Sequence, residues 1–134
     1  MIESAEEFLR LMRSENKEDY ERFRNEGAPI HVWETLMSKY PLANAWIVRN
    51  RKSPLEVLEK LADDESTLVR AEVASARRIS EKIQLKLAHD PEYSVRHSLA
   101  YNKKATTKVL TILSNDVEDA IANKAKEQLE NANN

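Results

Sequence analysis

The chain has 134 residues, of which 41% are hydrophobic and 33% are charged, and its formal net charge is −2. This composition fits one folded domain, and the small net charge gives no bulk basic field that would attract nucleic acid. The chain has no cysteine, which excludes disulfides and thiolate-bound metal or iron–sulfur sites. Its single glycine, Gly27, excludes glycine-rich phosphate loops and the G-x-S-x-G nucleophile elbow.

Residues 1–27 predict a pair of helices that caps the rest of the chain. Ser4 and Glu7 have the spacing of a capping box at the start of the first helix. A second helix is expected over residues 18–24, with Tyr20 and Phe23 facing inward and Gly27 ending it.

Targeting signals are not apparent in the sequence. The acidic N-terminus lacks the basic-then-apolar order of a secretory signal. No apolar run approaches the ~20 residues that a membrane span needs. We therefore expect a cytoplasmic protein that does not associate with membranes.

Residues 28–126 predict four repeats of about 26 residues, beginning near Ala28, Ser53, Ile79 and Ala105. The first and last repeats are degenerate, as terminal repeats often are. The two middle repeats share identical residues at an offset of 26, which are Lys60/Lys86, Leu61/Leu87, Ala62/Ala88, Asp64/Asp90, Val69/Val95, Arg70/Arg96 and Ala74/Ala100.

Each repeat predicts two helices. In the second repeat, Ser53 is expected to cap a helix whose first residue is Pro54. The segment 63–66 interrupts the apolar pattern and caps the next helix. The apolar face of that helix is predicted to comprise Leu68, Val69, Val73 and Ala74. The polar tail, residues 127–134, is expected to fray. The predicted fold is all-α, with about four helix pairs after the N-terminal pair.

The repeated motifs resemble those of a known family. L-A-D-D-x-x-x-x-V-R and L-A-H-D-P-x-x-x-V-R resemble HEAT-like repeats, and residues 50–58 (NRKSPLEVL) resemble the leucine-rich repeat variant. The resemblance implies a right-handed α–α superhelix, or solenoid, whose concave face binds partners. It indicates architecture far more than function. Some leucine-rich repeat variant proteins carry a cysteine-ligated iron–sulfur domain, and this feature cannot apply here.

Charged residues recur at the predicted turns. Basic pairs lie between repeats, at Arg51-Lys52, Arg77-Arg78 and Lys103-Lys104, and acids lie within repeats, at residues 63–65, 90–92 and 116–119. One interpretation is that the acids and bases complement the helix dipoles, with no further role. The alternative is that the basic edge binds an acidic protein or a phosphate backbone.

Two residue pairs, Asp64/Arg70 and Asp90/Arg96, keep the same spacing. The structural interpretation is a ladder in which each Asp caps a helix and each Arg bonds to that Asp or to the neighbouring repeat. A functional role for the arginines is the alternative.

The second helices supply the remaining candidate binding residues, which are Trp46, Arg49, Glu72, His97 and Tyr101. Aromatic residues and arginine often dominate binding energies. The structural alternatives are core packing for Trp46 and an ordinary surface aromatic for Tyr101. The three histidines do not form a metal-ligand set, and no pair of carboxylates stands out as a catalytic acid and base.

The sequence therefore favours a non-catalytic protein–protein interaction module without a cofactor. Its partner would be another protein, with an acidic protein as one option, and nucleic acid is disfavoured. One alternative is an immunity or antitoxin-type inhibitor of a toxin, suggested by the small size. A second alternative is nucleic-acid binding through the basic edge. The sequence leaves the oligomeric state open.

Overall fold

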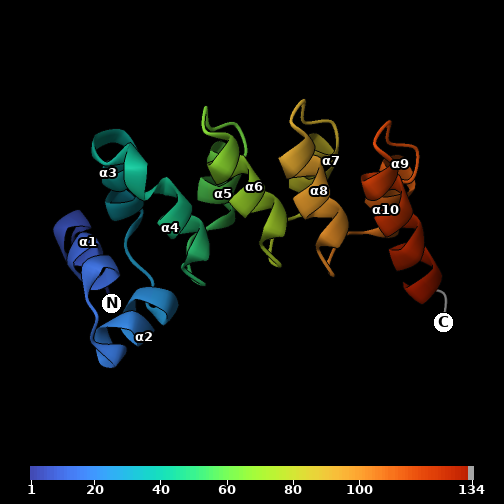
Figure 1. The fold of residues 1–134 in the computed structure, drawn as a ribbon. Coiled ribbons are helices and arrows are strands. Elements are labelled where there is room, and N and C mark those ends of the chain that lie inside the picture. The colour runs from blue at the N-terminus through green and yellow to red at the C-terminus, as the bar shows by residue number, and fades with distance from the viewer. Residues whose placement is uncertain (133–134) are drawn as a thin grey trace. The chain divides into compact units, whose positions relative to one another are not determined.

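The computed structural model describes residues 1–132, and this part of the chain contains ten α-helices, one short 3-10 helix and no strand (Figure 1). The prediction of an all-α fold is therefore confirmed. The chain divides into two compact units, which are residues 1–58 and the chain from Glu59 onward.

The helices of the first unit are α1 (Ala5–Arg13), α2 (Lys17–Asn25), α3 (Ile30–Lys39), the 3-10 helix η1 (Pro41–Ala43) and α4 (Asn44–Arg49). Helix α5 (Leu55–Leu61) crosses the division between the units. The helices of the second unit are α6 (Thr67–Ser75), α7 (Glu81–Ala88), α8 (Tyr93–Tyr101), α9 (Thr107–Leu113) and α10 (Asp119–Ala132).

An aromatic cluster forms the core of the first unit. The ring of Phe8 contacts Phe23 and Trp33 edge-on, with centroid distances of 5.3 and 5.7 Å. All three rings are buried, and the Trp33 indole N–H donates to the Ala28 carbonyl oxygen at 3.2 Å. Edge-to-face pairs of this kind add to the hydrophobic gain of burial. They connect α1, α2 and α3.

The N-terminal helix pair departs from the prediction at two residues. Helix α2 ends at Asn25 with Glu26 in an extended conformation, and Gly27 does not have a positive φ, so Gly27 is not its left-handed cap. Instead, the Gly27 carbonyl accepts a hydrogen bond from the Ile2 N–H at 2.9 Å. Tyr20 is 46% exposed, whereas Phe23 is buried as expected, because a short polar helix buries only a narrow face.

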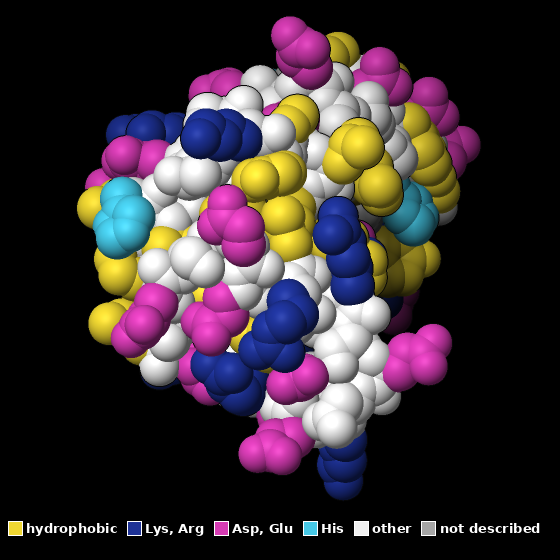
Figure 2. All heavy atoms as spheres, turned by 90° about the vertical axis from the view of Figure 1, so that its left-hand side faces the viewer, with side chains coloured by type: hydrophobic (Ala, Val, Ile, Leu, Met, Phe, Trp, Pro, Cys, Tyr) yellow, Lys and Arg dark blue, Asp and Glu magenta, His cyan; other side chains and the backbone are white. Residues whose placement is uncertain are grey.

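The face drawn in Figure 2 carries charges of both signs. Lys, Arg, Asp and Glu side chains lie among several hydrophobic areas there. In α1, Ser4 accepts a hydrogen bond from the Glu7 N–H, as predicted, while the Glu7 carboxylate accepts one from the Glu3 N–H at 2.8 Å.

The second unit consists of two rows of helices. Helices α6, α8 and α10 lie side by side, and α7 and α9 pack behind them (Figure 1). Three helices begin with a hydroxyl cap, in which Ser66, Ser80 and Thr106 accept hydrogen bonds from N–H groups three residues later. Buried side chains between the rows include Val69, Val73, Leu87, Leu99, Leu113 and Ile121.

Three further predictions require correction. Leu68 was expected on the apolar face of α6 but is 63% exposed, because it lies about 100° around the helix from Val69. Pro54 was expected as the first helical residue, but α5 begins at Leu55, and the Pro54 carbonyl accepts the first helical hydrogen bond. The predicted frayed tail is helical from residue 127 to residue 132, and its last two residues lie outside the described part.

None of the helices in residues 1–132 combines the length and the apolar content that a membrane crossing requires.

Candidate functional site

Two arginine–aspartate pairs join successive helix pairs of the second unit. The Arg70 Nε and Nη2 atoms donate to the two carboxylate oxygens of Asp90, at 2.9 and 3.3 Å. Arg96 binds Asp116 in the same way, at 2.8 and 3.4 Å. The remaining Nη1 atoms donate to backbone carbonyls, that of Asp64 for Arg70 and that of Asp90 for Arg96. This is the ladder that the shared spacing predicts.

The ladder favours the charged forms of Arg70, Arg96 and Asp116. Hydrogen bonding to Asp90 and Asp116 raises the pKa of Arg70 and Arg96, respectively. Burial alone would raise the pKa of Asp116, but hydrogen bonds from Arg96 and from the Glu118 N–H, together with the Arg96 charge, lower it overall. Each carboxylate also accepts a backbone N–H two residues later, so it fixes the turn before its helix.

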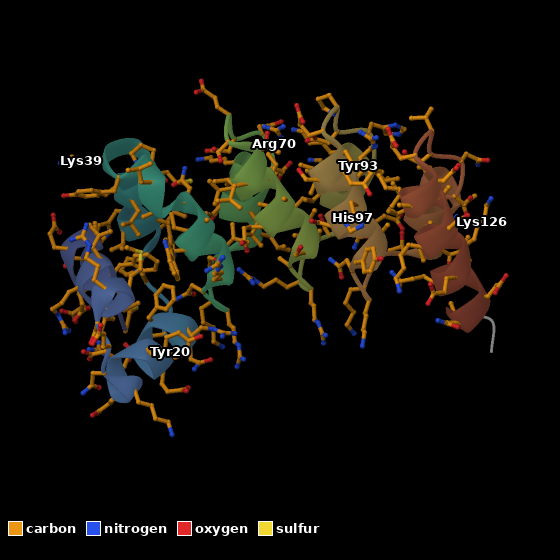
Figure 3. The ribbon with its side chains drawn as sticks, viewed as in Figure 1. Tyr20, Lys39, Arg70, Tyr93, His97 and Lys126 are labelled. Carbon is orange, nitrogen blue, oxygen red and sulfur yellow. The ribbon has the colours of Figure 1, made fainter. Side chains whose placement is uncertain are left out.

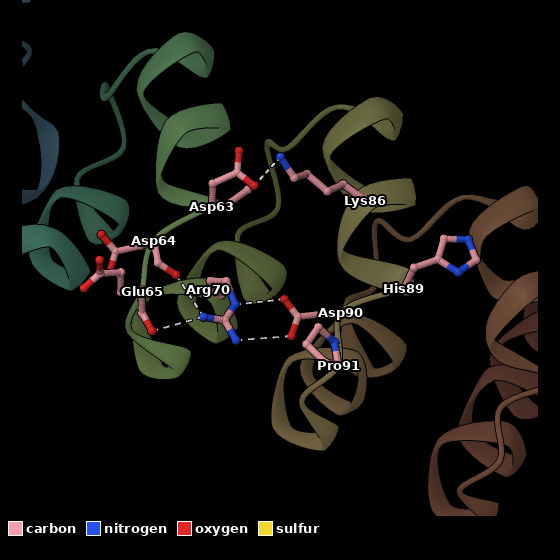
Figure 4. A pocket seen from close by; sticks show the side chains of 9 residues that line it. Asp63, Asp64, Glu65, Arg70, Lys86, His89, Asp90 and Pro91 are labelled. Carbon is pink, nitrogen blue, oxygen red and sulfur yellow. Dashed lines mark hydrogen bonds and ion pairs between the residues drawn. The ribbon is translucent and has the colours of Figure 1, made fainter.

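Two hollows lie over this ladder at the turns within helix pairs. One has a volume of about 430 Å³ and is drawn in Figure 4, and the second has a volume of about 610 Å³. Arg70 lies in the first, where its guanidinium is already occupied by Asp90 and by backbone carbonyls, and Lys86 forms an ion pair with Asp63. The Arg70 and Lys86 cations of the hollow are therefore already bound by Asp90, by backbone carbonyls and by Asp63, which indicates a structural role for them.

The side-chain amides of buried Asn102 and half-buried Gln128 form a second set of contacts between helix pairs. The Asn102 Nδ2 atom donates to the carbonyl oxygens of Ala74 and Ala76, at 2.8 and 3.0 Å. Twenty-six residues later, the Gln128 Nε2 atom donates to the carbonyl oxygens of Ala100 and Asn102. These amides satisfy carbonyls at the ends of α6 and α8, which the helices themselves leave without a donor.

An equivalent amide lies in the first unit. The Asn50 Nδ2 atom donates to the carbonyl oxygens of Phe23 and Glu26, at 2.6 and 2.9 Å. Sequence reasoning noted Asn50 only as part of a motif and missed the others. The sequence does contain a signal for these amides, because positions 50, 102 and 128 are separated by multiples of the 26-residue repeat and all carry Asn or Gln.

The structure brings two of the three predicted basic pairs together. Within the second unit, the turn that carries Arg77 and Arg78 is joined to the turn that carries Lys103 and Lys104 through buried Gln84. This amide donates to the Ile79 and Lys104 carbonyl oxygens and accepts from the Thr106 N–H. The third pair, Arg51 and Lys52, is exposed in the first unit.

The members of the basic turns differ in exposure. Arg77, Lys103 and Lys104 are exposed, whereas Arg78 is half-buried and burial lowers its pKa. The acidic turns lie at the opposite ends of α6, α8 and α10, so the second unit has one acidic and one basic edge (Figure 1). The separation of charge that the sequence predicts is therefore present in this unit.

An aromatic stripe runs along the exposed face of α8. Its rings are Tyr93, His97 and Tyr101, with centroid distances of 5.3 Å for the first pair and 4.6 Å for the second. The Lys124 ammonium of α10 lies 4.7 Å from the centroid of Tyr101. Figure 3 labels Tyr93 and His97 on the same side of α8. We call Tyr93, His97 and Tyr101 together the aromatic stripe.

The stripe is accessible, since Tyr93 is 43% exposed and Tyr101 is 53% exposed. The prediction named His97 and Tyr101 but missed Tyr93. A signal for Tyr93 was present, because residues at i, i+4 and i+8 lie on one face of a helix.

Of the other second-helix candidates, Trp46 and Arg49 belong to the first unit, and Glu72 belongs to α6 of the second. Trp46 of α4 is half-buried and contacts the Phe23 ring edge-on at 5.9 Å, which agrees with a packing role. The Arg49 guanidinium lies over the Trp46 ring, 4.7 Å from its centroid. Glu72 of α6 is half-buried.

Among residues 1–132, no group of three or more metal-ligating side chains is placed to hold a metal ion. Comparisons of the chain with protein-family models, with curated proteins and with solved structures found no match.

Proposed function

We propose that the chain is a non-catalytic protein-interaction module built from HEAT-like repeats of the leucine-rich repeat variant type, arranged as a right-handed solenoid. Contacts that recur at the repeat offset support this architecture. Arg70 and Arg96 make equivalent contacts to Asp90 and Asp116, and Asn102 and Gln128 make equivalent contacts to backbone carbonyls.

The aromatic stripe is the observation that carries the proposal. Two tyrosines remain about half exposed on α8, although the chain has enough apolar residues to fill its core elsewhere. Tyrosine combines a large apolar area with little conformational freedom, and it is enriched at the centres of protein interfaces. The stacking of His97 between Tyr93 and Tyr101 further restricts all three rings, so less entropy is lost on binding.

A binding role also accounts for the polar groups better than catalysis does. Catalytic groups need a free donor or acceptor that points at a substrate. In the hollows of the second unit, the arginine and aspartate side chains are bound to one another and to backbone groups. We propose that these groups stabilise the scaffold that presents the aromatic stripe.

The test is affinity capture from native lysate with three forms of the protein. The double variant Tyr93→Ser/Tyr101→Ser removes the stripe, and Tyr20→Ser removes a comparably exposed tyrosine from α2 as a control. We expect the wild type and the Tyr20 variant to retain a stoichiometric partner that the double variant loses, with similar circular dichroism for all three.

Each result of the capture decides between specific alternatives. If the double variant retains every partner of the wild type, the aromatic stripe is not the binding surface. If the wild type captures no stoichiometric partner, the proposal that the chain is a protein-interaction module is contradicted. A single tightly bound toxin would assign the module to the inhibitor class.

A further inference from the structure

The aromatic stripe runs between edges of opposite charge. At the N-terminal end of α8, the turns carry exposed Glu65, Glu92 and Glu118. At the C-terminal end, the joined turns carry exposed Arg77, Lys103 and Lys104. Glu65 lines the first hollow over the arginine–aspartate ladder and Glu118 lines the second, while Glu92 follows Pro91, which lines both. Gln84 joins the two basic turns.

The charges at both edges are available to a partner. Within the described residues, none of these six side chains takes part in an ion pair, whereas the nearby Arg70, Arg96 and Lys86 are already paired with Asp90, Asp116 and Asp63. In the ladder, the positive charge of each arginine is offset by the negative charge of the aspartate that it binds. The accessible field along the stripe is therefore negative where α8 begins and positive where it ends.

We propose that the aromatic stripe binds one amphipathic helix of a partner protein, which runs antiparallel to α8. The partner helix has acidic residues in its first turn and basic residues in its last turn. This inference rests on the proposed function, because it names the segment that an interaction module would recognise.

The orientation follows from charge complementarity. Helices favour acids near their N-termini and bases near their C-termini, because these charges complement the helix dipole. A helix with that common distribution meets the basic turns with its acidic end only when it runs opposite to α8. A parallel helix of the same composition would place like charges together at both ends and would be repelled.

The length of the stripe sets the length of the matching segment. Tyr93 and Tyr101 are eight residues apart on α8, which corresponds to about 12 Å or slightly more than two helical turns. Apolar residues at every fourth position of the partner would align with the three rings. With one charged turn beyond each end, the recognised helix has about 16 residues.

The test uses two hydrocarbon-stapled peptides of 16 residues with the same composition. Both carry leucine at every fourth position on one face. The matched peptide has glutamates in the first turn and lysines in the last, and the reversed peptide exchanges them. Stapling keeps the helicity of the two equal, which circular dichroism verifies. Fluorescence anisotropy at low ionic strength measures the affinity of each peptide for the full chain.

We expect the matched peptide to bind at least ten-fold more tightly than the reversed peptide. The double variant Lys103→Glu/Lys104→Glu should reduce this ratio or invert it, and Tyr93→Ser/Tyr101→Ser should weaken both peptides. Lys126→Glu, at an exposed lysine on α10, is the control for charge reversal alone and should leave the ratio unchanged.

Equal affinities, a preference for the reversed peptide, or no binding of either peptide would overturn the inference. Binding that depends on the tyrosines but not on charge direction would overturn the helix orientation while leaving the proposed interaction surface in place. The capture experiment decides the proposed function independently, because it does not assume a helical ligand.

Discussion

Arg96 has an acceptor for each of its three guanidinium nitrogen atoms. Nε and Nη2 donate to Asp116, and Nη1 donates to the Asp90 carbonyl oxygen. The side chains of Arg96 and Asp116 are only 13% and 7% exposed, so water cannot replace either partner fully. Removing one partner of such a pair lowers the stability of the folded state, because the other charge then stays buried without an opposite charge beside it.

The substitution Arg96→Leu is therefore expected to destabilise the second unit by about 3 kcal/mol. Urea denaturation followed by circular dichroism measures this change. The control is Lys86→Leu, which breaks the exposed pair of Lys86 and Asp63 and should cost less than about 1 kcal/mol. Equal losses for the two variants would show that the Arg96 pair behaves as a surface pair.

The same pair predicts a dependence of stability on pH. Contacts with Arg96 and the Glu118 N–H lower the pKa of Asp116 in the folded state from its ordinary value of 3.8. A lowered folded-state pKa stabilises the fold above the ordinary value, and this stability is lost as the pH falls through the folded-state pKa. The stabilisation by Asp116 should therefore be complete near neutral pH and decline below about pH 4.

We expect Asp116→Asn to be less stable than the wild type at pH 7, and the difference to shrink steadily between about pH 4 and pH 2. Urea midpoints measured across this range give the result. Glu130→Gln, at an exposed carboxylate without a hydrogen-bond partner among the described residues, should show no such convergence. A difference between Asp116→Asn and wild type that stays constant with pH would contradict the assignment.

At the level of secondary structure, α10 shows how one amide can extend a helix. Its last six described residues are polar or small apart from Leu129, and the sequence predicts fraying there. Gln128 nevertheless donates to the Ala100 and Asn102 carbonyls at the end of α8. This contact holds the final turns of α10 against the preceding helix pair.

The substitution Gln128→Ala should lower the stability of the second unit by about 1–3 kcal/mol, because two carbonyls at the end of α8 lose their donor. Hydrogen exchange should also accelerate in the last two turns of α10. Glu130→Ala, on the same helix but exposed, serves as the matched control. Unchanged exchange in the Gln128 variant would mean that packing alone orders this end of α10.

At the level of the whole molecule, the distribution of charge matters more than its total. The formal net charge is −2, and the exposed bases of the second unit are balanced by exposed acids at its opposite edge. A nucleic-acid backbone needs a continuous positive surface, because each neutralised phosphate contributes to affinity by releasing counterions. The charge pattern suits a dipolar protein segment better than a polyanion.

We therefore predict no gel shift of a 20-base-pair DNA duplex at about 20 mM salt and up to about 100 µM protein, a range in which non-specific DNA-binding proteins do bind. A lysine-rich protein of similar size is the positive control. A shift that weakens steadily as salt is added would favour nucleic-acid binding through the basic turns instead.

Much of the helical content could be predicted because its signals are local. Ser66 precedes α6 and Phe23 is buried in α2, as the capping and apolar patterns indicate. Leu68 and Tyr20 were placed wrongly, because periodicity gives the direction of a buried face but not its width. The width depends on how closely neighbouring helices approach, which is a property of the tertiary structure.

The candidate site was only partly predictable for a related reason. His97 and Tyr101 were recognised by residue type, whereas Tyr93 becomes part of the site only because the three rings stack on an α8 face that remains uncovered. A sequence can show that residues share a helix face. It cannot show whether another helix of the same chain covers that face.

The sequence by itself determined the all-helical fold, the recurrence of an Asp and an Arg at fixed spacing, and the alternation of acidic and basic turns. These follow from helix propensity, capping and dipole complementarity, which act within a few residues. Only the tertiary structure decided which carboxylate each arginine binds, which carbonyls Asn102 and Gln128 satisfy, and that the α8 rings stay exposed. Those outcomes depend on contacts between residues 20 to 28 positions apart, which exist only once the helix pairs have packed together.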